Sequence, residues 1–246
     1  MGAFMHKDLS KIVEKLSQAA TANLQCVTLY GSAASGNFLP GRSDLNLLCL
    51  LHRIDPAELR KLRSPARWWA RKGHPALLFL TIEELVSAAD IFAIELLEIK
   101  ANRRMLYGPD VFQSIEVPMT LHRQQVEREL RHSLIRLRQS YMAAGGNRKA
   151  LQKLMVKSFP TFSLLFRHTL IALGEQAPPT KEEAVKRLAA LLNFDSGSFV
   201  TLAAIRRREN SGKGLNLEDL FNGYLNAITY VVDEVDRRFE ELSLSK

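Results

Sequence analysis

The pattern of apolar residues changes once along this chain, and that change limits the folds open to it. Up to about residue 112, short β-rich apolar runs alternate with amphipathic helical patterns. Beyond residue 117 the β-rich runs stop, and long helical patterns are separated by turn signals such as "GGN" and "GEQAPPT". The sequence therefore predicts an α/β or α+β domain at 1–112 and an all-α helical bundle at 113–246, joined at "GPDVFQSIEVP".

Individual elements can be assigned from the same periodicity. The first half contains four strand-like runs, of which the last also fits a helix by composition: 26–31, 44–51, 76–81 and 92–99. Its helical patterns span 11–24, 56–71 and 82–89, with Pro56 suited to a first turn and Thr81 to an N-cap. Five helices are expected in the second half: 121–144, 149–173, 181–192, 198–208 and 217–242.

The charge balance favours anionic partners without selecting one. Lys and Arg (34) exceed Asp and Glu (26), which gives a net charge of +8. Much of this excess lies between residues 121 and 150, on one predicted helix. A solvated face is the ordinary interpretation of such charges, and the alternative is a surface that closes a nucleotide cleft or receives an anionic acceptor.

The remaining composition indicates a cytoplasmic protein. Cys26 and Cys49 both fall in apolar strand-like runs, so neither a disulfide framework nor a zinc site is expected. The first residues lack the apolar core of a signal peptide, and no run is long enough for a membrane span. We expect no membrane partner, and a homodimer is left open.

The stretch "LYGSAASGNFLPGRSDLN" is the part of the chain that suggests chemistry. A strand ending in Gly31 and Ser32 exposes backbone N–H groups, and glycine permits the close approach that phosphate oxygens require. Asp44 opens the next predicted strand. Because side chains alternate along a strand, Asp44 and Asn46 are expected on the same face.

This segment resembles the nucleotidyltransferase superfamily, which includes DNA polymerase beta and the aminoglycoside adenylyltransferases. The signature of that superfamily is Gly-Ser, a spacer, and then Asp-x-Asp/Glu at a strand start, and Gly31, Ser32 and Asp44 match it. "FAIELLEIKANRRMLYGPD" and "ERELRHSLIRLRQSY" also resemble segments of a bacterial subgroup with a helical C-terminal domain. The resemblance thus covers most of the chain and implies a nucleotidyltransferase-like domain with a mixed sheet.

The resemblance also implies site roles. Gly31 and Ser32 would hold the triphosphate, expected to be ATP, and Asp44 would bind Mg²⁺. Asn46 stands where the family has a second carboxylate, so it would be a weaker, neutral ligand. Glu95 is the candidate for the third ligand or catalytic base. It is preferred to Glu98, because a strand would place the two on opposite faces.

Several of these assignments have alternatives. Arg42 is a candidate phosphate contact or a solvated loop charge. Glu95 can instead form an ion pair with Lys100 or Arg103. His168 is expected to be a core histidine rather than a base, and the pair Trp68 and Trp69 is expected to pack rather than to stack on nucleic acid.

The resemblance implies the first two of three candidate functions, and the charge balance suggests the third. The first is Mg²⁺-dependent transfer of a nucleoside monophosphate from the triphosphate to a hydroxyl or phosphate of an unknown small-molecule or macromolecular acceptor, with the nucleotide between the two domains. The second, motivated by Asn46, is a nucleotide-binding regulatory module with weak or no catalysis. The third, motivated by the charge of +8, is a basic protein that binds nucleic acid.

Overall fold

The computed structural model describes residues 2–34, 44–207, 209, 212 and 214–244. The chain forms two compact units, Met1–Pro118 (unit 1) and Met119–Lys246 (unit 2). Within the described chain, no helix combines the length and the apolar character needed to cross a membrane.

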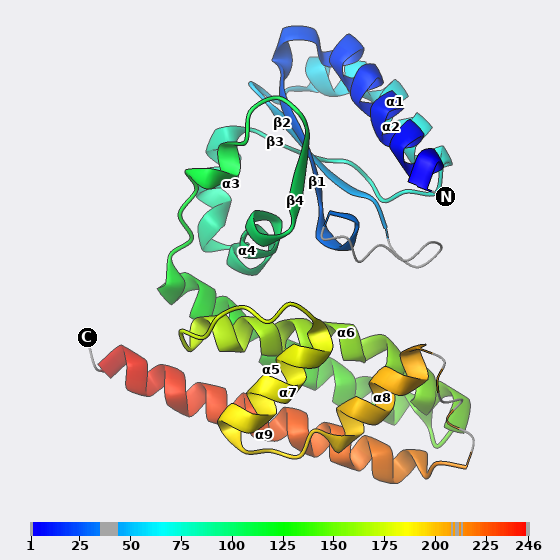
Figure 1. Cartoon of the computed structure of the whole chain (residues 1–246), viewed down its shortest axis with the longest axis vertical. Helices are drawn as coiled ribbons and strands as arrows, with labels where there is room; N and C mark the ends of the chain where they lie inside the picture. Colours follow the sequence, from blue (N-terminus) through cyan, green and yellow to red (C-terminus); the bar gives the residue numbers. More distant parts are fainter. Residues whose placement is uncertain (1, 35–43, 208, 210–211, 213, 245–246) are drawn as a thin grey trace. The chain divides into compact units, whose positions relative to one another are not determined.

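Unit 1 is built on a four-stranded mixed sheet with the order β3-β2-β1-β4. The central strand β1 pairs antiparallel with both β2 and β4, and β2 pairs parallel with β3. The strands are β1 (Leu24–Tyr30), β2 (Asn46–Leu51), β3 (Leu78–Leu80) and β4 (Arg103–Tyr107). The mixed sheet expected from the sequence is confirmed (Figure 1).

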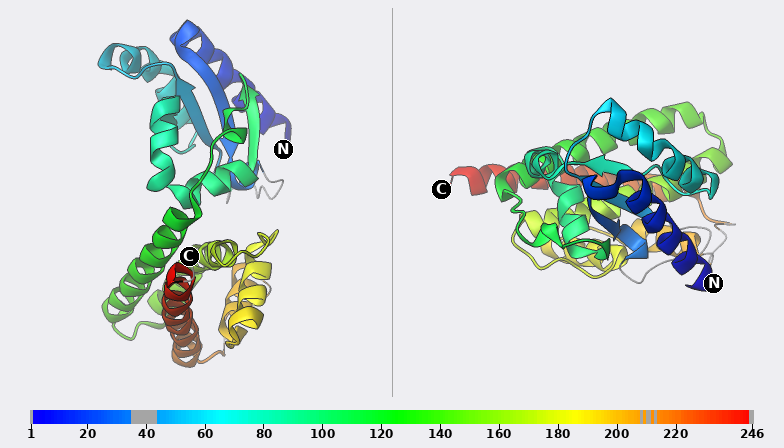
Figure 2. Two further views of the ribbon diagram at one scale, coloured as in Figure 1. Left: turned by 90° about the vertical axis from the view of Figure 1, so that its left-hand side faces the viewer. Right: turned by 90° about the horizontal axis from the view of Figure 1, so that it is seen from above.

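Helices cover both faces of this sheet because β1 and β2 are apolar on both sides. On one face, α1 (Gly2–Ala20) and α2 (Pro56–Arg71) pack on Leu47, Cys49 and Leu51. On the other, Leu48 and Leu50 meet the second helical layer, formed by α3 (Ile82–Ser87) and α4 (Ala93–Ala101). The helices α1 and α2 lie side by side (Figures 1 and 2). Short 3-10 turns join these elements: η1 (Thr21–Asn23), η2 (Gly31–Ala33), η3 (Ala88–Asp90) and η4 (Val111–Gln113).

The helix starts follow the capping signals in the sequence. Asp55 caps α2 by accepting hydrogen bonds from the backbone N–H groups of Ala57 and Glu58, and Pro56 occupies the first turn. Thr81 caps α3 in a reciprocal capping box with Glu84. Both predicted helix starts are confirmed.

The predicted fourth strand at 92–99 is wrong, and the helical alternative is correct. This run forms α4, in which Ala93, Leu96 and Ile99 are buried at helical spacing. The true fourth strand, β4, is "RRMLY". Its residues are at most partly buried, so it lacks the apolar run by which the other strands were recognised.

Unit 2 is an all-α bundle, as predicted. Its helices are α5 (Met119–Ala144), α6 (Arg148–Ala172), α7 (Lys181–Leu192), α8 (Gly197–Arg207) and α9 (Leu217–Leu244). The helix α6 contacts each of the other four. Buried aromatic side chains fill the centre of the bundle: Phe159, Phe162, Phe166, Phe199, Phe221 and Tyr224.

Candidate functional site

The end of β1 is a tight turn that requires glycine. Gly31 has a φ of +79°, in the left-handed region that residues with a Cβ rarely adopt. Its N–H donates to the carbonyl oxygen of Asn102 at 3.1 Å, and its carbonyl accepts from the N–H of Ala34 at 2.9 Å. The turn is therefore fixed to the chain that enters β4.

Asn46 lies beside this turn. In the sheet, Tyr30 pairs with Asn46 on β2 and with Arg103 on β4. A Cβ atom added to Gly31 would lie 3.4 Å from Asn46 Nδ2. The glycine turn, the first residue of β2 and the start of β4 thus meet at one end of the sheet.

The register of β2 also gives the direction of the Asn46 side chain. Leu48 and Leu50 face the layer of α3 and α4, and alternation places Asn46 on that same side. Asp44 is exposed and precedes β2 by two residues. The expectation that Asp44 opens the strand itself is wrong, because the strand begins at Asn46.

Glu95 and Glu98 sit on α4 rather than on a strand, which changes the argument about them. Residues three apart in a helix are neighbours on its surface, so the reason for admitting only one of these carboxylates no longer holds. Glu95 is exposed and Glu98 is partly buried. The end of α4 leads to the glycine turn, because the N–H of Asn102 donates to the Glu98 carbonyl and the Asn102 carbonyl accepts from Gly31.

An ion pair links the start of β4, next to the glycine turn, to the segment that follows β4. Arg103 forms a bidentate interaction with Asp110, with Nε to Oδ1 at 3.0 Å and Nη2 to Oδ2 at 2.7 Å. The Arg103 guanidinium holds the pKa of Asp110 below its ordinary value. Lys100 donates to the carbonyl oxygen of Ile115. No sequence motif predicts the Arg103–Asp110 ion pair or the hydrogen bond from Gly31 to Asn102.

The strands at this sheet end offer few oxygen donors for a metal ion. None of the four strands that the structure describes contains Asp or Glu. The stretch 35–43, "SGNFLPGRS", has none in its sequence either. Among described residues, no three His, Cys, Asp or Glu side chains form a metal-type cluster. The oxygen donors on this part of the chain are therefore one carboxylate, Asp44, two residues before β2, and one neutral amide, Asn46, at the start of β2.

Two of the predicted phosphate contacts cannot be placed. Arg42 lies outside the described residues, and so does the side chain of Ser32. The structure brings together Gly31 and Asn46, with Asp44 two residues before the latter.

Most cations of the predicted basic helix have partners inside unit 2. Arg131 lies 2.6 Å from Asp236 and 3.3 Å from Glu127. Arg138 donates to Thr229, and Arg123 donates to the carbonyl oxygen of Ala172. Much of the charge between 121 and 150 is thereby committed to holding the bundle.

Burial decides the sequence alternatives for His168 and Trp69 but not the one for Trp68. His168 is fully buried, as expected for a core histidine, and Trp69 is also buried. Trp68 is only partly buried.

Comparison with known proteins identifies the fold. No family model matches the sequence, and no curated protein matches it. A crystal structure of spectinomycin adenyltransferase AAD(9) from Enterococcus faecialis, with ATP and spectinomycin, matches with a TM-score of 0.56 and 12% sequence identity. The match covers 91% of this chain and 99% of that chain. The fold of this chain, a mixed four-stranded sheet with helices followed by a helical bundle, is therefore similar to that of spectinomycin adenyltransferase.

Proposed function

We propose that this protein binds a nucleoside triphosphate with one Mg²⁺ at the glycine turn of unit 1, and that it transfers the nucleotide slowly or not at all. The observation that carries the proposal is the small number of possible metal ligands beside the glycine turn. A neutral Asn46 packs beside Gly31, and the four strands carry no carboxylate to accompany Asp44.

The charge at such a site affects nucleotide binding and nucleotide transfer differently. Mg²⁺ is often held by one or two carboxylates together with substrate phosphates, so Asp44 and a triphosphate are enough to bind one ion. Transfer at an α-phosphate gathers negative charge on the attacking and leaving oxygens, and two ions offset that charge better than one. Asn46 supplies an oxygen without a charge. Nucleotide binding is therefore favoured over fast chemistry.

A second candidate is an active Mg²⁺-dependent nucleotidyltransferase that uses ATP and an unknown hydroxyl or phosphate acceptor. It is favoured by α4, whose two carboxylates share one side and whose end is hydrogen-bonded to the glycine turn. In this candidate Glu95 serves as third metal ligand or base. The solved structure with the same fold contains ATP and spectinomycin, which gives the acceptor class to test first.

Calorimetry tests the shared claim. Titration of Mg²⁺ with ATP or CTP into the wild type should show binding, and Asp44→Asn should weaken it. Asp233→Asn is the matched control, because it removes one exposed carboxylate from α9 in unit 2. Absence of binding by every nucleotide, or equal affinity in the wild type and Asp44→Asn, contradicts the proposal.

Pyrophosphate release separates the two candidates. If the site is a degraded one, Asn46→Asp should raise the rate well above that of the wild type, because it restores a second charge. Substantial release by the wild type, unchanged in Asn46→Asp and lost in Glu95→Gln, would establish the active transferase instead.

A further inference from the structure

The outer side of α2 carries an uninterrupted line of positive charge. Between residues 59 and 82 the sequence contains six basic residues and no Asp or Glu. Four of the six recur at helical spacing and are all exposed: Arg60, Arg63, Arg67 and Arg71. We call these four residues the arginine stripe. At 1.5 Å of rise per residue, the stripe runs for about 16 Å along the helix.

The stripe has few internal partners. Within the described part of the chain, no carboxylate lies at ion-pair distance from Arg60, Arg63 or Arg67, and Arg71 bonds only the carbonyl oxygen of Arg67. The single acid of this helix, Glu58, is buried and is bound by Lys61 at 2.7 Å and by Arg53 at 3.3 Å. The stripe therefore differs from the basic helix α5, whose arginines hold the bundle together.

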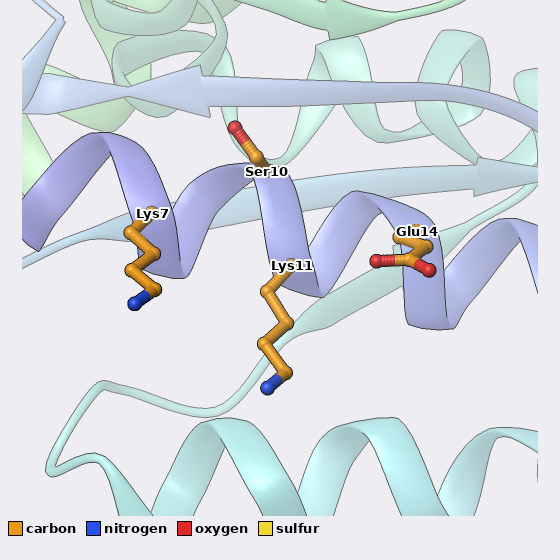
Figure 3. A pocket seen from close by; sticks show the side chains of 4 residues that line it. All are labelled: Lys7, Ser10, Lys11 and Glu14. Carbon is orange, nitrogen blue, oxygen red and sulfur yellow. The ribbon is translucent and has the colours of Figure 1, made fainter.

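A second group of cations surrounds Trp68, next to the stripe. The ammonium groups of Lys11, Lys15 and Lys72 lie 6.0, 5.7 and 5.6 Å from the centre of the Trp68 ring. Lys7 and Lys11 line an open surface depression with Ser10 and Glu14, and both lysines project from the same side of α1 (Figure 3). Lys72 also lies 3.5 Å from Asp8. Three ammonium groups held around one ring favour an anion between them.

We infer that this surface, the arginine stripe with Trp68 and its three lysines, binds a nucleic acid through its phosphate backbone. Regularly spaced arginines along an exposed helix match a polyanion, whose binding is dominated by contacts of Lys and Arg with phosphates. Trp68 at the edge of the stripe offers an aromatic surface among cations, as in proteins that bind single strands. The inference is independent of the nucleotide site at Gly31.

The apolar side of α2 argues against a membrane as the partner. Helices that lie on membranes insert large apolar side chains. Leu62, Pro65 and Trp69 of α2 are already buried in unit 1. Among the described side chains of α1 and α2, Leu59 is the exposed large hydrophobic residue, and it is 42% exposed.

Fluorescence anisotropy with a labelled single-stranded RNA tests the inference. The test variant is R60Q/R63Q/R67Q. The matched control is K149Q/K153Q/K157Q, which removes three exposed cations at helical spacing from α6 of unit 2. The affinity should fall about tenfold or more in the stripe variant and little in the control, and the slope of log affinity against log salt should decrease by about 2 in the stripe variant. Equal losses in both variants would show binding through net charge alone and would overturn the inference.

Acrylamide quenching of tryptophan fluorescence shows whether RNA binds at Trp68 itself, which a change in affinity caused by lost charge does not show. The chain has two tryptophans, and Trp69 is 1% exposed, so acrylamide quenching reports mainly on Trp68. Saturating RNA should protect Trp68 from acrylamide in the wild type. Absence of RNA binding, RNA binding without this protection, or tighter binding to phosphatidylserine vesicles than to RNA would each reject the surface as a nucleic-acid site. Circular dichroism of each variant confirms that it is folded.

Discussion

Replacing His122 in the helical bundle should remove much of the acid sensitivity of unit 2. His122 on α5 and His168 on α6 are both fully buried, and His122 Nε2 lies 2.9 Å from His168 Nδ1. His122 Nδ1 has no hydrogen-bond partner among the described residues. Burial, together with the neighbouring His168 and Arg123, lowers the pKa of His122 from 6.5 to about 3. In the folded bundle His122 is therefore neutral down to about pH 3.

The size of the effect depends mainly on the unfolded chain. Between pH 6.5 and pH 3 the unfolded chain binds a proton at His122 and the folded chain does not, so acid favours unfolding. Lowering the pH from 7 to 5 then costs about 2 kcal/mol of unfolding free energy from this one imidazole. The figure is insensitive to the folded pKa, since any value well below 5 gives the same result.

The assay is urea unfolding at pH 7 and pH 5 of the wild type and of His122→Gln, which keeps a donor for His168 but does not titrate. Far-UV circular dichroism follows mainly the helices of unit 2. Fluorescence follows unit 1, because both tryptophans lie there. The loss of stability on going from pH 7 to pH 5 should be about 2 kcal/mol smaller in His122→Gln than in the wild type.

The control is His132→Gln, which removes an exposed histidine from the same helix and should leave the pH dependence unchanged. If His122→Gln kept the full acid-induced loss, or if His132→Gln reduced it equally, the argument from burial would be refuted.

Three further predictions concern unit 1. Gly108→Ala should lower the unfolding free energy by about 3 kcal/mol, because the added Cβ would lie 2.0 Å from the Gln25 carbonyl oxygen. The control, Gly73→Ala, has a similar φ but open space around it and should lower the unfolding free energy by only about 1 kcal/mol. Equal shifts of the two variants in thermal unfolding would contradict this reasoning. Gly31→Ala should weaken ATP binding by about tenfold in calorimetry, because the turn at φ +79° cannot keep its shape; an unchanged affinity would place the nucleotide elsewhere. Arg103→Gln should raise the pKa of Asp110 toward 3.8 in an NMR titration, because the substitution removes the guanidinium that stabilises the ionised carboxylate. The stability that this carboxylate contributes is present above pH 3.8 and is lost as the pH falls through its lower folded pKa. An unchanged pKa would show that Arg103 is not the cause of the shift.

The elements with strong periodicity could be predicted from the sequence. The strand β1, the helix α2 with Pro56 in its first turn and the five bundle helices follow directly from apolar spacing and turn residues. The strand β4 could not be found this way, because "RRMLY" is half-buried at the edge of the sheet and opens with two arginines. The run at 92–99 is apolar enough for a buried strand or a buried helix, and only tertiary packing decides between them.

The sequence predicts only those parts of the candidate site that lie on strands consecutive along the chain. Gly31 directly follows β1 and Asn46 begins β2, so their proximity follows from the antiparallel pairing of β1 with β2. Asn102 reaches the turn through β4, which the sequence did not reveal. The basic surface was assigned to residues 121–150 by counting charges, yet counting does not show which arginines have partners. The structure leaves the arginines of α2 exposed and pairs much of α5 internally.

Hydrogen exchange measured by mass spectrometry tests the central claim most directly. On addition of Mg²⁺ and ATP, the backbone amides of residues 32 and 33, in the turn after β1, should exchange more slowly, because phosphate oxygens would accept hydrogen bonds from them, whereas the N–H groups of Gly31 and Ala34 are already hydrogen-bonded. Asp44→Asn should weaken that protection, and Asp233→Asn should not. If ATP bound without slowing exchange at residues 32 and 33, or slowed it only in the helices of unit 2, the account of a nucleotide site at this turn would be contradicted.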